Sequence, residues 1–145
     1  MKMKRIHSSI SHDVETRAPS WGQLVYAIAL AVVIVVASGR SSVASPNIVD
    51  FDKAAHFAVF GLLATLVARS GFRPSRMGWA VLIVSLFGLT DEWHQGSTPG
   101  RSMEAYDWIA DTLGAITAVV LYRYFVWYRR LLEKPLSQHN AWVEK

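Results

Sequence analysis

Four mostly apolar stretches dominate the pattern of hydrophobic and polar positions along the chain. They cover residues 21–38, 52–68, 77–95 and 108–128. A helix that crosses a membrane needs about 20 predominantly apolar residues to span a hydrocarbon layer of about 30 Å, and each stretch approaches that length. The first is nearly free of polar groups, whereas the other three contain ionisable side chains. Taken singly, these three could also be buried helices of a soluble bundle.

The placement of charged residues distinguishes the two interpretations. Lys and Arg accumulate on the cytoplasmic side of short membrane loops. If four helices cross a membrane and both termini are cytoplasmic, 12 of the 15 Lys and Arg residues lie inside and seven of the 11 Asp and Glu residues lie outside. A soluble bundle has no reason to alternate its charges in this way. The sequence therefore predicts an all-α, polytopic membrane helical bundle with four transmembrane helices and both termini cytoplasmic.

The predicted organisation has three parts: a cytoplasmic N-terminal tail (1–20), a four-helix membrane domain (21–128) and a cytoplasmic C-terminal tail (129–145). A basic start before an apolar run is also typical of a cleaved secretory signal. Because 20 residues precede the run, an uncleaved first helix is favoured. Aromatic residues gather at the inner end of the fourth stretch, as in an interfacial belt.

Composition narrows the function classes. Charged residues make up 18% of the chain, against about 25% in a soluble domain. With no cysteine, a disulfide framework, a thiolate metal site and a cysteine nucleophile are excluded. The net charge of +4 is the sum of a basic inner and an acidic outer surface, so nucleic acid is not an expected partner. The expected partner is the lipid bilayer; no cofactor is predicted and the oligomeric state stays open.

Most of the unusual polar residues fall at one depth, the outer end of the second, third and fourth helices. Ionisable groups near hydrocarbon are costly and are functional candidates by default. At 100° per residue, Asp91 and Gln95 share a face of the third helix. Glu92 and His94 lie on either side of that face, and Trp93 points away from it, toward lipid. Glu92 and Gln95 are in register with the small residues Gly78, Ser85 and Gly88, so we expect them on the packing face.

Small residues share helix faces with the acidic ones and let helix backbones approach closely in lipid. On the third and fourth helices these small residues are Gly78, Ser85, Gly88, Gly114 and Ala118. In the fourth helix they follow Asp107 and Asp111. Asp107 could be a site residue or simply the N-cap of its helix. Asp111 lies one turn deeper, and this position favours the interpretation that it is a site residue or has a buried pairing role.

The second helix places Asp52 and His56 four residues apart, on one face. His56 could be functional, or it could make a structural hydrogen bond to Asp52 or to another helix. A separate stripe of small residues on the opposite face indicates a central position in the bundle.

A turn between the third and fourth helices presents Arg101, almost the only cation on the acidic outer surface. Pro99 and Gly100 are a favourable type II turn pair. The planar guanidinium of Arg101 could bind a phosphate or a carboxylate. It could equally be a counter-ion to Glu92 or Asp91.

Four short motifs resemble the VanZ-like membrane protein family in order and spacing. They are DKAAHF (52–57), DEWHQ (91–95), PGR (99–101) and DWIADTLGA (107–115), within residues 48–120. The resemblance implies a bacterial, multi-pass helical protein of the cell membrane, and the family is named for a protein that lowers susceptibility to the glycopeptide teicoplanin. The family-like polar residues, by position, are Asp52, Lys53, His56, Glu92, Gln95, Arg101, Asp107 and Asp111. The family often has asparagine where this chain has Asp111.

Three hypotheses on function stay open. An outward-facing polar site could bind a lipid head group, a wall precursor or a glycopeptide. An intramembrane enzyme could use Glu92, Asp91 or His56 as general base, or hold a divalent cation, although no serine or threonine has an evident place beside these groups and no HExxH motif occurs. The polar network could also serve packing alone. The candidate site comprises Asp52, Lys53, His56, Asp91, Glu92, His94, Gln95, Arg101, Asp107 and Asp111.

Overall fold

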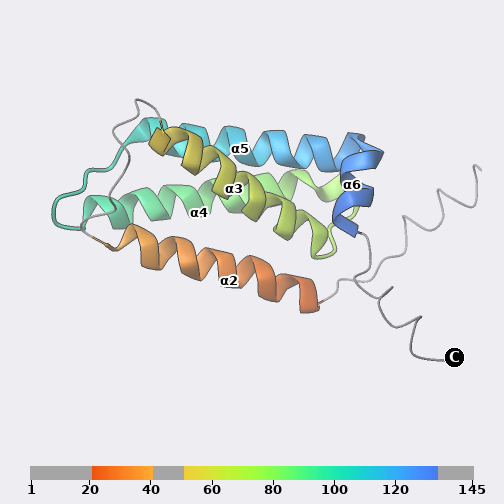
Figure 1. The fold of residues 1–145 in the computed structure, drawn as a ribbon, viewed down its shortest axis with the longest axis horizontal. Coiled ribbons are helices and arrows are strands. Elements are labelled where there is room, and N and C mark those ends of the chain that lie inside the picture. The colour runs from red at the N-terminus through yellow and green to blue at the C-terminus, as the bar shows by residue number, and fades with distance from the viewer. Residues whose placement is uncertain (1–20, 41–50, 134–145) are drawn as a thin grey trace, which may run out of the picture.

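Four long helices lie side by side in the computed structural model, which describes residues 21–40 and 51–133 (Figure 1). They are α2 (Trp21–Ser38), α3 (Phe51–Arg69), α4 (Gly78–Gly96) and α5 (Ala105–Tyr124). A 3-10 turn, η1 (Pro74–Arg76), precedes α4, and a short helix, α6 (Val126–Glu133), follows α5. All regular structure in these two segments is helical, so the predicted all-α class is confirmed.

The first three helices begin and end within one residue of the predicted stretches. The fourth differs, because α5 and α6 are bent by 98° at their junction. Phe125 has an extended backbone there (φ −100°, ψ 99°), and Arg69 at the end of α3 donates from Nη2 to the Leu132 carbonyl at 2.8 Å. The predicted single helix 108–128 is therefore divided, and α6 turns across the end of the bundle (Figure 1).

The predicted tails reach beyond what the structure describes. Residues 1–20, 41–50 and 134–145 lie outside the described residues. Within the predicted C-terminal tail, 129–133 continue α6.

The most extensive contact between helices is that of α3 with α5. The Phe57 carbonyl lies directly on Gly114, where any side chain would collide with it, and Gly61 faces Gly114 in the same crossing. Small residues therefore permit the close approach that the sequence predicted. Because α3 also contacts α2 and α4, it holds the expected central position.

The packing face of α4 agrees with its predicted stripe at two of three positions. Gly88 is buried, and a Cβ there would lie 2.8 Å from Asp111 Oδ2, so the glycine makes room for this carboxylate. Ser85 Oγ lies within hydrogen-bond distance of Thr112 Oγ1, at 2.8 Å. Gly78, at the start of α4, faces open space instead.

The exterior of the bundle is apolar. Val25, Val32, Leu86 and Leu113 each expose more than half of their surface. Helices of 18 to 20 residues are about 27–30 Å long at 1.5 Å per residue, close to a bilayer core. By length and apolarity α3 can cross a membrane, as can the α5–α6 pair if it is one bent span, whereas α2 is a shorter apolar helix. The structure thus gives one or two clear candidate spans.

The alternating directions of the helices sort the charged residues into two ends (Figure 1). We call acidic end the one where α2 and α4 finish and α3 and α5 begin. The opposite end, where α3 and α5 finish and α4 begins, is the basic end. Acidic residues at the acidic end are Asp52, Asp91, Glu92, Glu104, Asp107 and Asp111. Arginines at the basic end are Arg69, Arg73, Arg76, Arg123, Arg129 and Arg130.

Candidate functional site

Four carboxylates lie inside the acidic end. Asp91 and Glu92 come from the last turns of α4, and Asp107 and Asp111 from the first turns of α5; none is more than 3% exposed. The helical spacing explains this burial, since each pair lies on a face that packs against another helix. The predicted packing position of Glu92 is therefore found in the structure, as is the buried pairing role that was one alternative for Asp111.

His56 links α3 to the carboxylates of α5. Its Nδ1 lies 2.9 Å from Asp111 Oδ1, to which it donates when it carries a proton there. Its Nε2 lies 4.0 Å from Asp107 Oδ2. The imidazole stacks on the buried Phe60 ring, with centroids 6.0 Å apart. The hydrogen bond of His56 is therefore made to another helix, while Asp52, one turn earlier, is exposed.

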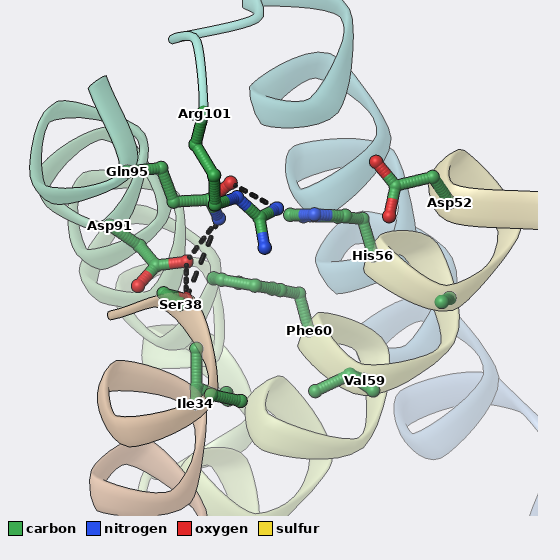
Figure 2. Close-up of a pocket in the computed structure, with 11 residues that line it drawn as sticks. Ile34, Ser38, Asp52, His56, Val59, Phe60, Asp91, Gln95 and Arg101 are labelled. Atoms are coloured by element: carbon green, nitrogen blue, oxygen red, sulfur yellow. Dashed lines mark hydrogen bonds between the residues drawn. The ribbon is translucent and has the colours of Figure 1, made fainter. Parts of the chain in front are cut away.

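Asp91 is the centre of a second network, which joins α2 to α4 (Figure 2). Ser38 Oγ donates to Asp91 Oδ2 at 2.8 Å, and Gln95 Nε2 donates to the same oxygen at 3.0 Å. Arg101 Nη2 then donates to Gln95 Oε1 at 2.7 Å. The face shared by Asp91 and Gln95 was predicted, but the participation of Ser38 was not.

Glu92 and Asp107 are held by the start of α5 and by α3. Glu92 Oε2 accepts the backbone N–H of Glu104, the N-cap residue of α5, at 2.8 Å. Asp107 lies inside the helix, and its Oδ1 is 3.3 Å from Lys53 Nζ. The alternative of Asp107 as N-cap is therefore wrong. Lys53 also reaches Glu104 Oε2, at 3.4 Å.

Several buried carboxylate oxygens have no hydrogen-bond donor within the described part of the chain. They are Asp91 Oδ1, Glu92 Oε1, Asp107 Oδ1 and Asp111 Oδ2. Asp107 Oδ1 nevertheless has the Lys53 ammonium nearby as an ion-pair partner. A buried charge without a partner is costly, so the other three oxygens are sites where a cation or a hydrogen-bond donor would be favoured.

An open pocket of about 160 Å³ lies between α2, α3 and α4. Ile34, Val59 and Phe60 form part of its apolar wall, and Figure 2 shows Asp91 and Arg101 at its polar side. Its further polar lining residues are Ser38, Asp52, His56 and Gln95. The pocket therefore combines an apolar wall with groups that can both donate and accept hydrogen bonds.

Arg101 makes no ion pair with any carboxylate among the described residues. Its hydrogen bond goes to the neutral Gln95 amide, and the side chain is half-buried. The counter-ion role toward Glu92 or Asp91 is therefore not what the structure shows.

The structure does not gather all ten predicted site residues at the pocket. Glu92, Asp107 and Asp111 are buried near it without lining it, and Lys53 flanks them. His94 is exposed on another side of α4, close to Gly39. Trp93, at 74% exposed, points outward as predicted.

Ser38 corrects one sequence-based argument. The sequence indicated no serine or threonine fixed beside the acidic groups, yet Ser38 is 6% exposed and bonded to Asp91. Its only signal was being the last residue of the first apolar stretch.

Within residues 21–40 and 51–133, two overlapping sets of side chains have donor atoms spaced closely enough for a metal ion. Imidazole and carboxylate atoms of His56, Glu92 and Asp111 lie within 4.8 Å of one another, as do those of Asp52, His56 and Asp107.

A protein-family model described as VanZ/LLP1 matches residues 13–128. The match covers most of the chain and includes all ten predicted site residues. No curated protein and no solved structure shows a significant match.

Proposed function

The chain belongs to the VanZ/LLP1 family, and on that premise we propose that it is a multi-pass bacterial membrane protein whose outward-facing pocket binds an amphipathic molecule of the cell envelope. The single observation that carries the proposal is Arg101. Its guanidinium lies at a partly apolar pocket and bonds only a neutral amide among the described residues.

The proposed topology has four spans, α2 to α5, with the acidic end outside and both chain termini in the cytoplasm. The separation of charges between the two ends supports it, because arginine is retained on the cytoplasmic side. In this arrangement residues 21–128 form the membrane domain, flanked by cytoplasmic segments 1–20 and 129–145. Helix α6, with Trp127 and Tyr128, lies along the inner interface, where aromatic side chains are favoured.

The first helix belongs to the bundle in this proposal and is not a cleaved signal. Ala27 and Ile34 of α2 are buried in the core, and Ser38 hydrogen-bonds Asp91. Removing α2 would expose these contacts and open one side of the pocket.

The lining of the pocket indicates the chemistry of its ligand. Arg101 is suited to a phosphate or carboxylate, and the free Oδ1 of Asp91 is suited to a hydroxyl or an ammonium. The wall formed by Ile34, Val59 and Phe60 is suited to an acyl or other apolar group. Lipid head groups, lipid-linked wall precursors and lipophilic glycopeptides share this combination of groups.

Such binding at the outer leaflet would change susceptibility to drugs directed at the envelope. A protein that binds the drug, or the wall precursor that the drug recognises, lowers the amount of productive drug–target complex. Teicoplanin-type compounds fit this description because they are both polar and lipophilic.

The test is rescue of a deletion strain against a panel of envelope-active compounds that includes teicoplanin. We expect the wild-type gene to restore the parental susceptibility profile and Arg101→Gln to fail at wild-type membrane abundance. The matched control is Arg73→Gln, an exposed arginine at the basic end, which should restore it fully.

Asp91→Asn separates binding from packing, because it keeps the size of the side chain and removes its charge. Normal abundance with lost rescue supports a binding role. Full rescue by Arg101→Gln would contradict the proposal, and collapse of Asp91→Asn abundance would favour a network that serves packing alone.

A further inference from the structure

Three helices bring three candidate ligands, one imidazole and two carboxylates, to one point beside the pocket. His56 from α3, Glu92 from α4 and Asp111 from α5 each offer an atom within 4.8 Å of the other two. His56 Nδ1 and Asp111 Oδ1 are 2.9 Å apart. Two ligands bound at 2.0–2.2 Å to one ion lie about 3 to 3.5 Å apart, so this pair needs only a small adjustment.

Two orphaned oxygens belong to the same trio. Glu92 Oε1 and Asp111 Oδ2 are buried without a hydrogen-bond donor in the described part of the structure, and both residues are 0% exposed. Burying an ionised carboxylate oxygen without a hydrogen-bond donor lowers the stability of the folded protein. A cation bound between these carboxylates would offset that cost.

Lys53 and Arg101, two described cations of the acidic end, are directed to other groups. Lys53 lies beside Asp107 and Glu104, and Arg101 donates to Gln95. Among the described residues, only His56 is close enough to pair with Asp111, and Glu92 has a backbone N–H as its one partner. Two carboxylates with a neutral imidazole carry two negative charges, which a divalent ion balances.

The alternative trio, Asp52 with His56 and Asp107, is less suited. Asp52 is exposed to solvent, and the Lys53 ammonium lies 3.3 Å from Asp107 Oδ1, where it would repel a second cation.

We propose that His56, Glu92 and Asp111 bind one divalent metal ion of the zinc or manganese class. A mixed set of imidazole and carboxylate ligands suits such ions. The site extends beyond the proposed pocket and does not depend on the ligand of that pocket, although His56 belongs to both.

Neighbouring groups hold two of the three ligands in place, as outer-shell partners do at metal sites. The Glu104 N–H fixes Glu92 Oε2 at 2.8 Å, and Phe60 stacks against the His56 ring. Gly88 leaves the space that the Asp111 carboxylate fills.

The test uses the full chain, purified in detergent, stripped with a chelator and titrated with Zn²⁺ or Mn²⁺ alone. Calorimetry and metal analysis should give about one ion per wild-type chain. Glu92→Gln and Asp111→Asn should each weaken binding by about tenfold or more. Asp52→Asn is the control and should bind as the wild type does.

Two results would overturn the proposal. One is wild-type protein that binds neither ion more tightly than the Glu92→Gln variant. The other is loss of binding in Asp52→Asn, which would move the ion to the alternative trio. If Glu92→Gln or Asp111→Asn does not fold, the wild-type protein alone provides the test. Added metal should raise its unfolding temperature, and an unchanged unfolding temperature would contradict the site. The rescue assay with Arg101 variants tests binding at the pocket, and the titration tests metal binding by His56, Glu92 and Asp111. The two proposals can therefore fail separately.

Discussion

The two ends of the bundle carry opposite charges and differ in how far these charges are buried. At the acidic end, four of the six carboxylates are buried, and they are linked across all four long helices. At the basic end, Arg73, Arg76 and Arg123 are exposed, and Arg123 lies over the Tyr124 ring. Buried, connected charges need designed partners, whereas exposed charges of one sign need only water or lipid head groups. The acidic end therefore has the features expected of the proposed site, and the basic end those expected of the proposed membrane interface.

The largest effect should come from the glycine at the close crossing of α3 and α5. Gly114→Ala places a Cβ against the Phe57 carbonyl, so α3 and α5 must separate. We expect a loss of at least about 3 kcal/mol in the free energy of unfolding and loss of membrane abundance. Gly78→Ala at the basic end, where nothing lies within 4 Å, is the control and should be neutral. Equal tolerance of the two variants would contradict the close crossing.

A second prediction compares one residue from each end. His56→Ala removes the partner of the buried Asp111 carboxylate and should cost about 3 kcal/mol, the lower end of the range for leaving a buried charge unpaired. Arg123→Ala at the basic end should stay within about 0.5 kcal/mol, as exposed substitutions usually do. Unfolding of purified protein by denaturant in mixed micelles measures both. Comparable losses at the two residues would show that their ends do not differ.

A smaller effect is expected at the link between α2 and the acidic end. Ser38→Ala removes one hydrogen bond to Asp91 and should cost about 1.5 kcal/mol, the lower end of the range for a bond to a charged group. Ser97→Ala removes a hydroxyl that donates to the Trp93 carbonyl at an exposed position and serves as the control. A Ser38→Ala variant as stable as Ser97→Ala would mean that α2 is held by apolar packing alone.

Periodicity predicted the acidic end well because its residues follow the geometry of single helices. Asp91 and Gln95 are one turn apart and are hydrogen-bonded, and the stripe from Asp107 to Ala118 is buried. These relations depend only on the angle between successive residues.

Contacts between helices could not be predicted in the same way. The first helix is apolar on every side, so no pattern showed that Ser38 would face Asp91. His94 is only a small rotation from Asp91, yet it falls on the exposed side of α4. The bend at Phe125 lies in a stretch that stays apolar and aromatic, so hydrophobicity did not mark it. The segment after the bend accepts a hydrogen bond from Arg69 of α3, a contact that the local sequence does not show. Family motifs indicated the candidate residues, but their hydrogen bonds depend on how the helices pack.

The claim that the two ends face opposite sides of a membrane is tested most directly by labelling. The chain has no cysteine, so single cysteines can be introduced at Thr98, between α4 and α5, and at Ser75, in η1. A membrane-impermeant maleimide applied to intact cells should label Thr98→Cys, and should label Ser75→Cys only after the membrane is opened. Labelling of Ser75→Cys in intact cells with protection of Thr98→Cys, or equal labelling of both, would contradict the account.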